Sequence, residues 1–266
     1  MTTRLPIYQI DAFAEAPFTG NPAAVVPLET WLPDTVLQQI AMENNLAETA
    51  FFIPVPGASD ADFHLRWFTP AIEVDLCGHA TLATAAVLFD RLSFGGDLIR
   101  FQSQSGILSV RNLDGRYQLD FPARPATPTR VPDGLAQALG GIEPVGFLRA
   151  KKSMAILADE AEVLAVRPDV DFIAGLDGDG LIVTAPGSET DAVSRYFAPH
   201  AGINEDPVTG SAHCTIVPYW AERLGKTSLH CRQVSARGGD LFCDLADERV
   251  LMAGAARFYL EGAINV

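Results

Sequence analysis

Glu48 and His79 are the residues best suited by type and position to proton-transfer chemistry. Glu48 directly precedes the apolar run TAFFI, where a carboxylate is partly removed from water and can both accept and donate a proton. His79 follows Gly78 at the start of an apolar helical pattern, where the positive end of the helix dipole favours a neutral imidazole that donates a hydrogen bond. Two plainer alternatives stay open from these segments alone: a solvated strand-edge glutamate and a histidine bonded to local backbone.

The loop NEDPVTGSAH supplies a second group of candidates. Asp206 precedes a proline, Gly210 lets the backbone approach a ligand closely, and Ser211 can cap the following helix or bind an anion. A turn role for Asp206 and simple capping by Ser211 are the alternatives. His213, two positions beyond Ser211, is expected to point elsewhere on the helix.

Two further residues lie in similar loops. Asn21, in TGNPAAVV, is a candidate for substrate binding or a turn residue. Cys77 precedes the Gly-His pair at a helix start, where a thiolate could be activated, but a cysteine between Leu and Gly is more often a small buried apolar residue.

Known cofactor and metal motifs are missing from the sequence. The four cysteines form no CxxC pair and no zinc spacing, which predicts reduced thiols. Neither a P-loop, a GxGxxG turn nor a nucleophile elbow occurs. We therefore expect no cofactor and no metal, and acid/base chemistry on an anionic substrate.

A motif that occurs twice, 132 positions apart (205 minus 73), positions these candidates. The copies are EVDLCGHATLATAAVLFDRL, from Glu73 to Leu92, and EDPVTGSAHCTIVPYWAERL, from Glu205 to Leu224. A match at one fixed offset indicates a duplicated half. Each copy is a Gly-led helix start, whose free N–H groups and dipole attract anions. Two such starts facing one cleft would bind a small carboxylated molecule.

The segments around the first motif predict the architecture. Residues 80–89 are apolar on every side, so this helix must be surrounded by protein. Its neighbours, including LPIYQIDAF, ETAFFIPV and DFHLRWFTP, have the patterns of strands, and Asp114-Gly115 predicts a hairpin turn. We infer an α+β fold in which a sheet curls around a central helix.

The proline-rich segment PARPATPTRVPDG is expected to be an extended linker between two halves. We place the first half at residues 1–124 and the second at residues 125–266, with the last strand free to return to the first half.

Composition narrows the class of protein. Apolar residues form 48% of the 266 residues and charged ones 20%, as in a compact globular protein. The net charge of −14 makes nucleic acid and anionic membrane surfaces poor partners. The N-terminal residues lack the apolar core of a signal peptide, and no run is long enough to span a membrane, so a cytoplasmic location is expected.

Four segments together resemble the phenazine-biosynthesis isomerase (PhzF-like) family, within the wider diaminopimelate-epimerase and proline-racemase fold. They are DAFAEAPFTGNPAAVV, NLAETAFF, FTPAIEVDLCGHATLATA and GINEDPVTGSAH, in order and at the family's spacing. The resemblance implies two similar halves, each a curved, mostly antiparallel sheet around a central helix, with the active site between them. It also implies a homodimer.

The same resemblance assigns roles to residues. The family's acid/base glutamate falls on Glu48, its Gly-His pair on Gly78 and His79, and its Asp and Ser on Asp206 and Ser211. The implied reaction is cofactor-free movement of a proton between carbon atoms of a small carboxylate. In the phenazine enzyme that substrate is a dihydro-3-hydroxyanthranilate.

Departures from the phenazine enzymes keep two other functions in view. The chain has Cys77 before the Gly-His pair, as the epimerases do, and the loop Pro207–Thr209 also differs. One alternative is therefore an epimerase or racemase that uses Cys77, although the matching position of the second motif is Thr209. The other is a non-catalytic protein that binds a small ligand on the same fold.

Overall fold

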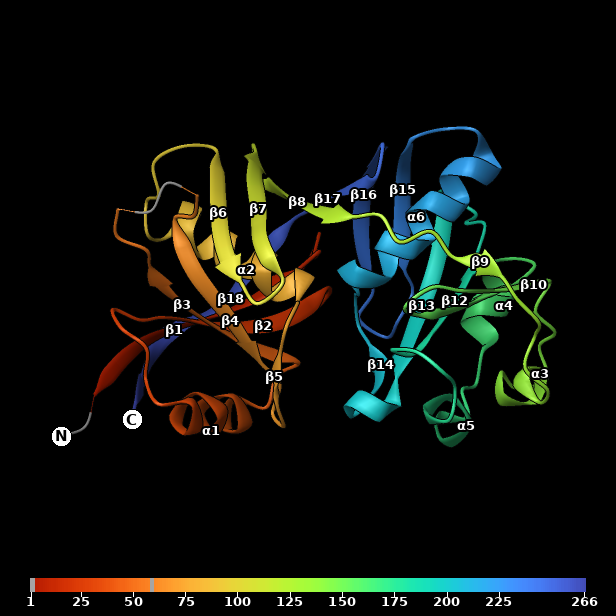
Figure 1. Ribbon diagram of the computed structural model, residues 1–266, viewed down its shortest axis with the longest axis horizontal. Helices are drawn as coiled ribbons and strands as arrows, with labels where there is room; N and C mark the ends of the chain where they lie inside the picture. Colours follow the sequence, from red (N-terminus) through yellow and green to blue (C-terminus); the bar gives the residue numbers. More distant parts are fainter. Residues whose placement is uncertain (1–2, 58–59) are drawn as a thin grey trace. The chain divides into compact units, whose positions relative to one another are not determined.

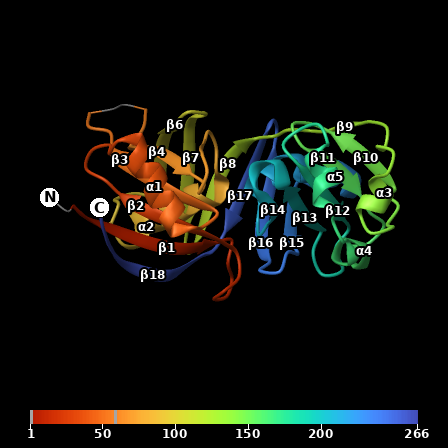
Figure 2. The same ribbon diagram turned by 90° about the horizontal axis from the view of Figure 1, so that it is seen from below.

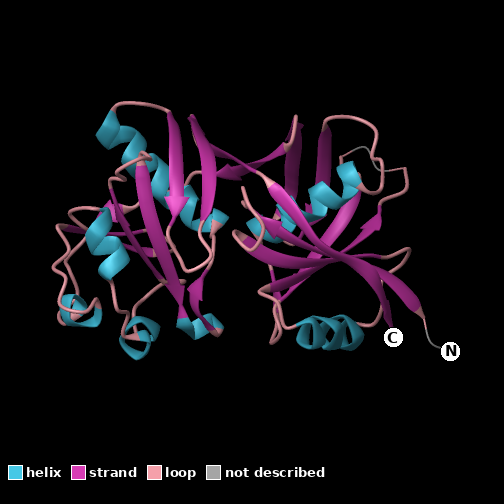
Figure 3. Cartoon of the chain, turned by 180° about the vertical axis from the view of Figure 1, so that it is seen from behind, coloured by secondary structure: helices cyan, strands magenta, loops and turns pink. Residues whose placement is uncertain are grey.

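The computed structural model describes residues 3–57 and 60–266 and divides the chain into two compact units. The first contains residues 1–120 and 253–266, and the second contains residues 121–252. Strands outweigh helices in both (Figure 3). Within the described residues, no helix combines the length and apolar character needed to cross a membrane.

The first unit is a mixed sheet with mostly antiparallel pairing. Strand β1 pairs with β18 and β2, β2 runs parallel to β3, and β3 pairs with β4. Strand β4 also pairs with β5 and runs parallel to β6, which continues through β7 to β8. The bounds are β1 Arg4–Ala12, β2 Asn21–Pro27, β3 Glu48–Pro54, β4 Phe63–Phe68, β5 Glu73–Val74, β6 Leu98–Ser103, β7 Gly106–Leu113, β8 Arg116–Pro122 and β18 Ala256–Asn265.

Helix α2 (Gly78–Asp90) lies inside this curved sheet (Figure 1). It contacts β1, β2, β3, β7 and β18, and every residue from Gly78 to Leu88 is buried. The helix carries no Asp, Glu, Lys or Arg before Asp90, and its alanines let the strands approach closely. The predicted helix with protein on all sides is therefore confirmed.

Helix α1 (Asp34–Asn44) packs on the other face of the same sheet (Figure 2). Its buried residues, Leu37 among them, join a core cluster with Phe51 and Phe68 of β3 and β4. The helix ends at Asn45, whose left-handed backbone (φ 49°) suits asparagine. This outer layer supports β3, the strand that carries Glu48.

The second unit repeats the same plan. Five strand pairs of the second unit have the same directions, in the same order, as five pairs of the first. The order is antiparallel, parallel, antiparallel, parallel, antiparallel in β10–β11, β11–β12, β12–β13, β13–β15 and β15–β16. It is the same in β1–β2, β2–β3, β3–β4, β4–β6 and β6–β7. Helix α6 (Gly210–Leu224) begins 132 residues (210 minus 78) after α2. This shared order confirms the predicted duplication. The strands are β9 Thr127–Pro128, β10 Gly146–Arg149, β11 Ser153–Ile156, β12 Leu181–Ala185, β13 Ala192–Ala198, β14 Ile203–Asp206, β15 Ser228–Gln233, β16 Gly239–Ala246 and β17 Arg249–Gly254.

Short helices cover the second sheet where α1 covers the first. Buried Leu135, Val163 and Ile173 of these helices join Leu181 and Val183 of β12 in one core cluster. The helices are α3 Leu135–Ala138, α4 Glu160–Ala165, α5 Val170–Ala174 and the 3₁₀ helix η1 Pro199–Ala201.

One expectation about local structure was wrong. The segment expected to be an extended linker contains β9, which pairs with β10, so part of it belongs to the second sheet. Strands β17 and β18 are separated at Ala255. Gly254, the last residue of β17, packs closely, since a Cβ there would lie 2.3 Å from the Phe13 ring.

Candidate functional site

Glu48 and His79 lie in contact in the first unit. Glu48 is the first residue of β3, and His79 is the second residue of α2. Nε2 of His79 lies 3.0 Å from a carboxylate oxygen of Glu48, and the two residues are 5% and 8% exposed. The Nε2 and Oε2 atoms are buried, yet their directions do not form an aligned hydrogen bond. An acid/base group and its charge partner are thus held together away from water.

Asn21 and Cys77 flank the other nitrogen of the same imidazole. Nδ1 of His79 lies 3.2 Å from the Asn21 amide nitrogen and 3.5 Å from Sγ of Cys77. Asn21 is the first residue of β2, and Cys77 is the residue before α2. The roles in the Asn21 contact depend on the charge of the ring: a neutral ring with its proton on Nε2 accepts from the amide at Nδ1, and an imidazolium donates at Nδ1 to the amide oxygen. Four predicted or considered residues are therefore brought together.

The charge state of His79 differs from the expectation. Burial lowers the pKa of His79, but Cys77 and the Glu48 carboxylate raise it, and the outcome is well above the usual histidine value. We attribute the rise to Glu48, because a protonated Cys77 carries no charge. The helix dipole, on which the expectation of a neutral ring rested, is outweighed by a carboxylate at 3.0 Å. The imidazole can thus hold a proton near neutral pH.

Cys77 is a protonated thiol at neutral pH. Burial, followed by the nearby Glu48 carboxylate, raises the pKa of Cys77 to about 11. Its position before α2 does not activate it, because the low-polarity surroundings penalise the thiolate. A buried, protonated thiol agrees with the interpretation of Cys77 as a small apolar residue. It does not agree with the interpretation of Cys77 as a nucleophile.

Asp206 is held by residues that the sequence did not single out. It is the last residue of β14, and the Thr209 hydroxyl donates to its carboxylate. The buried Gln233 side chain donates to the Asp206 carbonyl (2.7 Å) and accepts from the Thr209 N–H (2.9 Å). Thr209 could have been found from the sequence, because alignment of the two motifs places it opposite Cys77. No sequence pattern marks Gln233.

The start of α6 is arranged differently from the expectation for Ser211. Gly210 and Ser211 are its first two residues, and the N-cap is Thr209, without a side-chain capping bond. Ser211 is therefore a residue of the first turn and not the cap. His213 is fully buried, and its Nδ1 donates to the Thr209 carbonyl (2.8 Å). This bond to local backbone gives His213 a structural role.

An arginine–glutamate pair braces the strand before each helix. Glu73, in β5, accepts two hydrogen bonds of 2.7 Å from Arg66. Glu205, which is 132 positions later (205 minus 73), accepts two from Arg195, of 2.7 and 2.9 Å. Both glutamates begin a motif copy, so the duplication preserved the pair together with the helix start. Such two-point pairs fix planar groups and limit loop motion.

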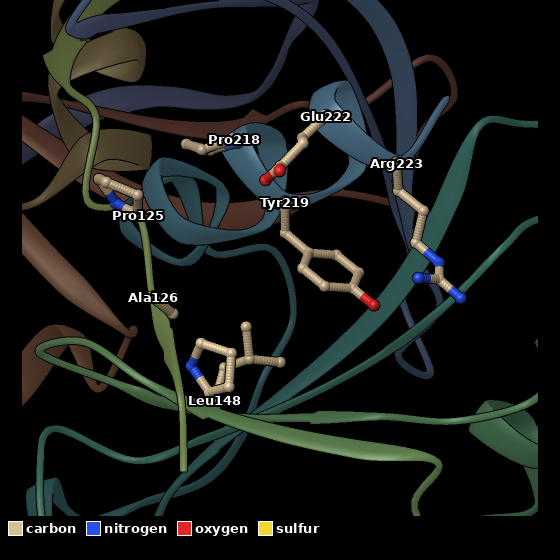
Figure 4. A pocket seen from close by; sticks show the side chains of 8 residues that line it. Pro125, Ala126, Leu148, Pro218, Tyr219, Glu222 and Arg223 are labelled. Atoms are coloured by element: carbon tan, nitrogen blue, oxygen red, sulfur yellow. The ribbon is translucent and has the colours of Figure 1, made fainter. Parts of the chain in front are cut away.

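A separate groove of about 640 Å³ lies in the second unit, away from these residues. Figure 4 shows its lining, with Tyr219, Glu222 and Arg223 of α6 on one side and Pro125, Ala126 and Leu148 on the other. None of the predicted site residues lines it. The groove is thus separate from the candidate residues of both motifs.

Comparison with known proteins places these motifs in context. The profile of the family described as phenazine biosynthesis-like protein (PhzC-PhzF) matches residues 10–262. An uncharacterized isomerase of Pseudomonas aeruginosa is 50% identical, covering 98% of this chain and 99% of its own length. The crystal structure of a PhzF-family protein of Enterococcus faecalis superposes with a TM-score of 0.95 at 45% identity, covering 99% of this chain and all of that one.

The wider fold is shared with epimerases. A hydroxyproline epimerase from Agrobacterium vitis matches with a TM-score of 0.66 at 9% identity, over 99% of this chain and 93% of its own. At this identity the likeness concerns the fold alone. It confirms the expected epimerase-like architecture.

Proposed function

This chain is an isomerase of the phenazine biosynthesis-like (PhzC-PhzF) family, and on that premise we propose that Glu48 moves a proton between carbon atoms of a small carboxylated substrate. The observation that carries the proposal is the buried contact of 3.0 Å between Glu48 and His79. A carboxylate in such surroundings has an imidazolium to balance its charge while it is ionised.

In the proposed reaction Glu48 is first the base and then the acid. Its carboxylate removes a proton from one carbon of the substrate and returns it to another carbon. His79 stabilises the ionised carboxylate at the start, and Asn21 fixes the imidazole through Nδ1. No cofactor takes part, since the same glutamate serves both half-reactions.

We assign binding of the substrate carboxylate to the N–H groups at a motif helix start. The first N–H groups of α2, at Gly78 and His79, attract a carboxylate through the helix dipole. Gly210 and Ser211 offer the same groups at the start of α6, with the Ser211 hydroxyl in addition. Asp206, held by Thr209 and Gln233, orients a polar substituent of the substrate.

An epimerase that uses Cys77 is the second candidate, favoured by the 3.5 Å contact between Sγ and the His79 imidazole. It ranks lower because the pKa of Cys77 is raised to about 11 by burial. The second motif also has Thr209 at the matching position, so a pair of equivalent thiols is missing. A homodimer in the cytoplasm is part of the proposal and rests on resemblance to the family.

Deuterium exchange followed by proton NMR tests this function. The protein in deuterated water is incubated with trans-2,3-dihydro-3-hydroxyanthranilate and with a panel of small amino and hydroxy acids. We expect one compound to gain carbon-bound deuterium or to isomerise with wild type and not with Glu48→Gln. A compound that binds measurably but exchanges with neither protein would favour a ligand-binding role.

A further inference from the structure

We propose that Glu48, Cys77 and His79 form a binding site for a soft divalent cation such as Zn²⁺, and that the bound cation inhibits proton transfer by Glu48. The three side chains offer a carboxylate, a thiol and an imidazole, the donor types that Zn²⁺ takes in proteins. Their ligand atoms all lie within 4.8 Å of one another, and all three residues are buried.

The distances fit a tetrahedral ion after a small adjustment. Bonds of about 2.0 Å to nitrogen and oxygen and about 2.3 Å to sulfur place neighbouring ligand atoms roughly 3.3 to 3.6 Å apart. The nearest approaches are 3.0 Å between Glu48 and His79 and 3.5 Å between Cys77 and His79. These contacts involve different nitrogens of His79, and one ion binds only one of them. The ring or one neighbouring side chain must therefore reorient, within ligand atoms that already lie no more than 4.8 Å apart.

A second observation points to a shared ligand. Oε2 of Glu48 and Nε2 of His79 are buried and only 3.0 Å apart, yet neither forms a hydrogen bond in the described structure. A donor and an acceptor at this distance would normally align. With Nε2 deprotonated, each of the two atoms has a lone pair that a bound cation could accept.

The charges of the site also suit a divalent ion. Binding releases two protons to solvent, one from the Cys77 thiol and one from the His79 imidazolium, so the ion meets one carboxylate, one thiolate and a neutral imidazole. Two negative charges then balance the ion in a buried place, where an unbalanced charge is costly. Three protein ligands leave a fourth position for water or a substrate carboxylate.

Sequence spacing gave no sign of this site, because the donors come from two elements that are distant in the chain. Glu48 begins β3, and the other two ligands surround the start of α2. The duplicated half provides an internal comparison, since Gly180, Thr209 and Ser211 stand at the matching positions. The donor set is therefore particular to the first unit.

The functional consequence rests on the proposed role of Glu48. A carboxylate and an imidazole that ligate Zn²⁺ cannot exchange protons with a substrate. The isomerase would be silenced when free zinc rises and restored by a chelator.

Titration of chelator-treated, full-length protein with Co²⁺ tests the site without any substrate. We expect one Co²⁺ per chain and a thiolate-to-cobalt charge-transfer band in the near ultraviolet. The band should disappear in Cys77→Ser and persist in Cys214→Ser, which removes another buried thiol. Glu48→Gln and His79→Gln should each weaken binding by about 100-fold or more, because lost outer-shell partners alone cost 10- to 100-fold.

Three results would overturn the site: no charge-transfer band in wild type, a band that survives in Cys77→Ser, or affinity unchanged in both Glu48→Gln and His79→Gln. Should Cys77→Ser fail to fold by circular dichroism, the wild-type band and the other variants still decide the question. The readout needs no turnover, so failure of the metal site and failure of the isomerase proposal can be told apart.

Discussion

His79 lies 3.0 Å from the Glu48 carboxylate although the two residues belong to different elements, the start of α2 and the start of β3. The parallel pairing of β2 with β3, with Ala23 opposite Glu48, also brings Asn21 to the same place. This group forms because the sheet curves around a buried helix whose first turn lies beside two strand starts. The curvature of the sheet around α2 therefore also brings together the side chains of the proposed chemistry.

The contact with Glu48 predicts how stability depends on pH at His79. The pKa of His79 is lowered by burial but raised overall by Cys77 and Glu48. A histidine whose pKa rises on folding adds stability that is complete below its unfolded value, about 6.5, and is lost as pH rises through the folded value. The free energy of unfolding of wild type, relative to His79→Gln, should thus be larger at about pH 6 than at about pH 9. Urea denaturation at several pH values measures this difference; a flat profile, or one that increases with pH, would contradict it.

The opposite dependence is expected at His213. Burial lowers the pKa of His213 to about 4, with the Thr209 carbonyl acting against the shift. The unfolded chain binds a proton below pH 6.5 that the folded protein accepts only near pH 4, so stability falls as pH decreases through this window. Between pH 7 and pH 4 wild type should lose on the order of 3 kcal/mol more than His213→Gln. Equal losses in the two proteins would show that His213 is accessible to protons in the fold.

The two arginine–glutamate pairs should stabilise the fold by similar amounts. Arg66 and Arg195 are 14% and 13% exposed, and each makes a two-point contact with a partly buried glutamate. Changing either arginine to Met should cost about 2 kcal/mol, below the range for fully buried pairs because water reaches the glutamates. Arg130→Met is the matched control, since its pair with Asp133 is exposed and should contribute no more than about 0.5 kcal/mol. Thermal or urea unfolding of the three variants gives the comparison, and equal effects at Arg66 and Arg130 would refute the bracing role.

The thiol of Cys77 should react slowly. Because burial raises its pKa to about 11, only a small fraction is thiolate at neutral pH. Alkylation of native protein by iodoacetamide, followed by mass spectrometry of the Cys77 peptide, should be slow at pH 7 and become faster toward pH 10. Rapid modification at pH 7 would instead support the epimerase alternative.

Much of the fold was predictable because its strongest signals are local. The apolar segment after Gly78 has no polar face, so it requires a surrounding sheet. The second motif repeats the first 132 positions later (210 minus 78), which predicted a second unit of the same plan. Asp114-Gly115 predicted the β7–β8 hairpin, and both residues have the positive φ that such a turn requires.

Local patterns select the candidate residues of the site but do not reveal their contacts. Glu48 and His79 were recognised from their positions beside a strand and a helix, whereas their contact depends on pairing between distant strands. Gln233 could not be found, because a glutamine at a strand end has no local pattern that reveals a buried bond to the Asp206 carbonyl. The charge of His79 was misjudged for the same reason, since a neighbouring carboxylate is invisible in a local segment.

The most direct test of the central claim compares exchange rates in wild type, Glu48→Gln, Cys77→Ser and Glu43→Gln. Glu43 is an exposed glutamate of α1 and serves as the matched control. With the compound that exchanges deuterium in wild type, Glu48→Gln should lose at least about 100-fold in rate, as expected for removal of a general acid/base. Cys77→Ser and Glu43→Gln should stay within a few-fold of wild type. An active Glu48→Gln together with an inactive Cys77→Ser would contradict the account and assign the chemistry to the thiol.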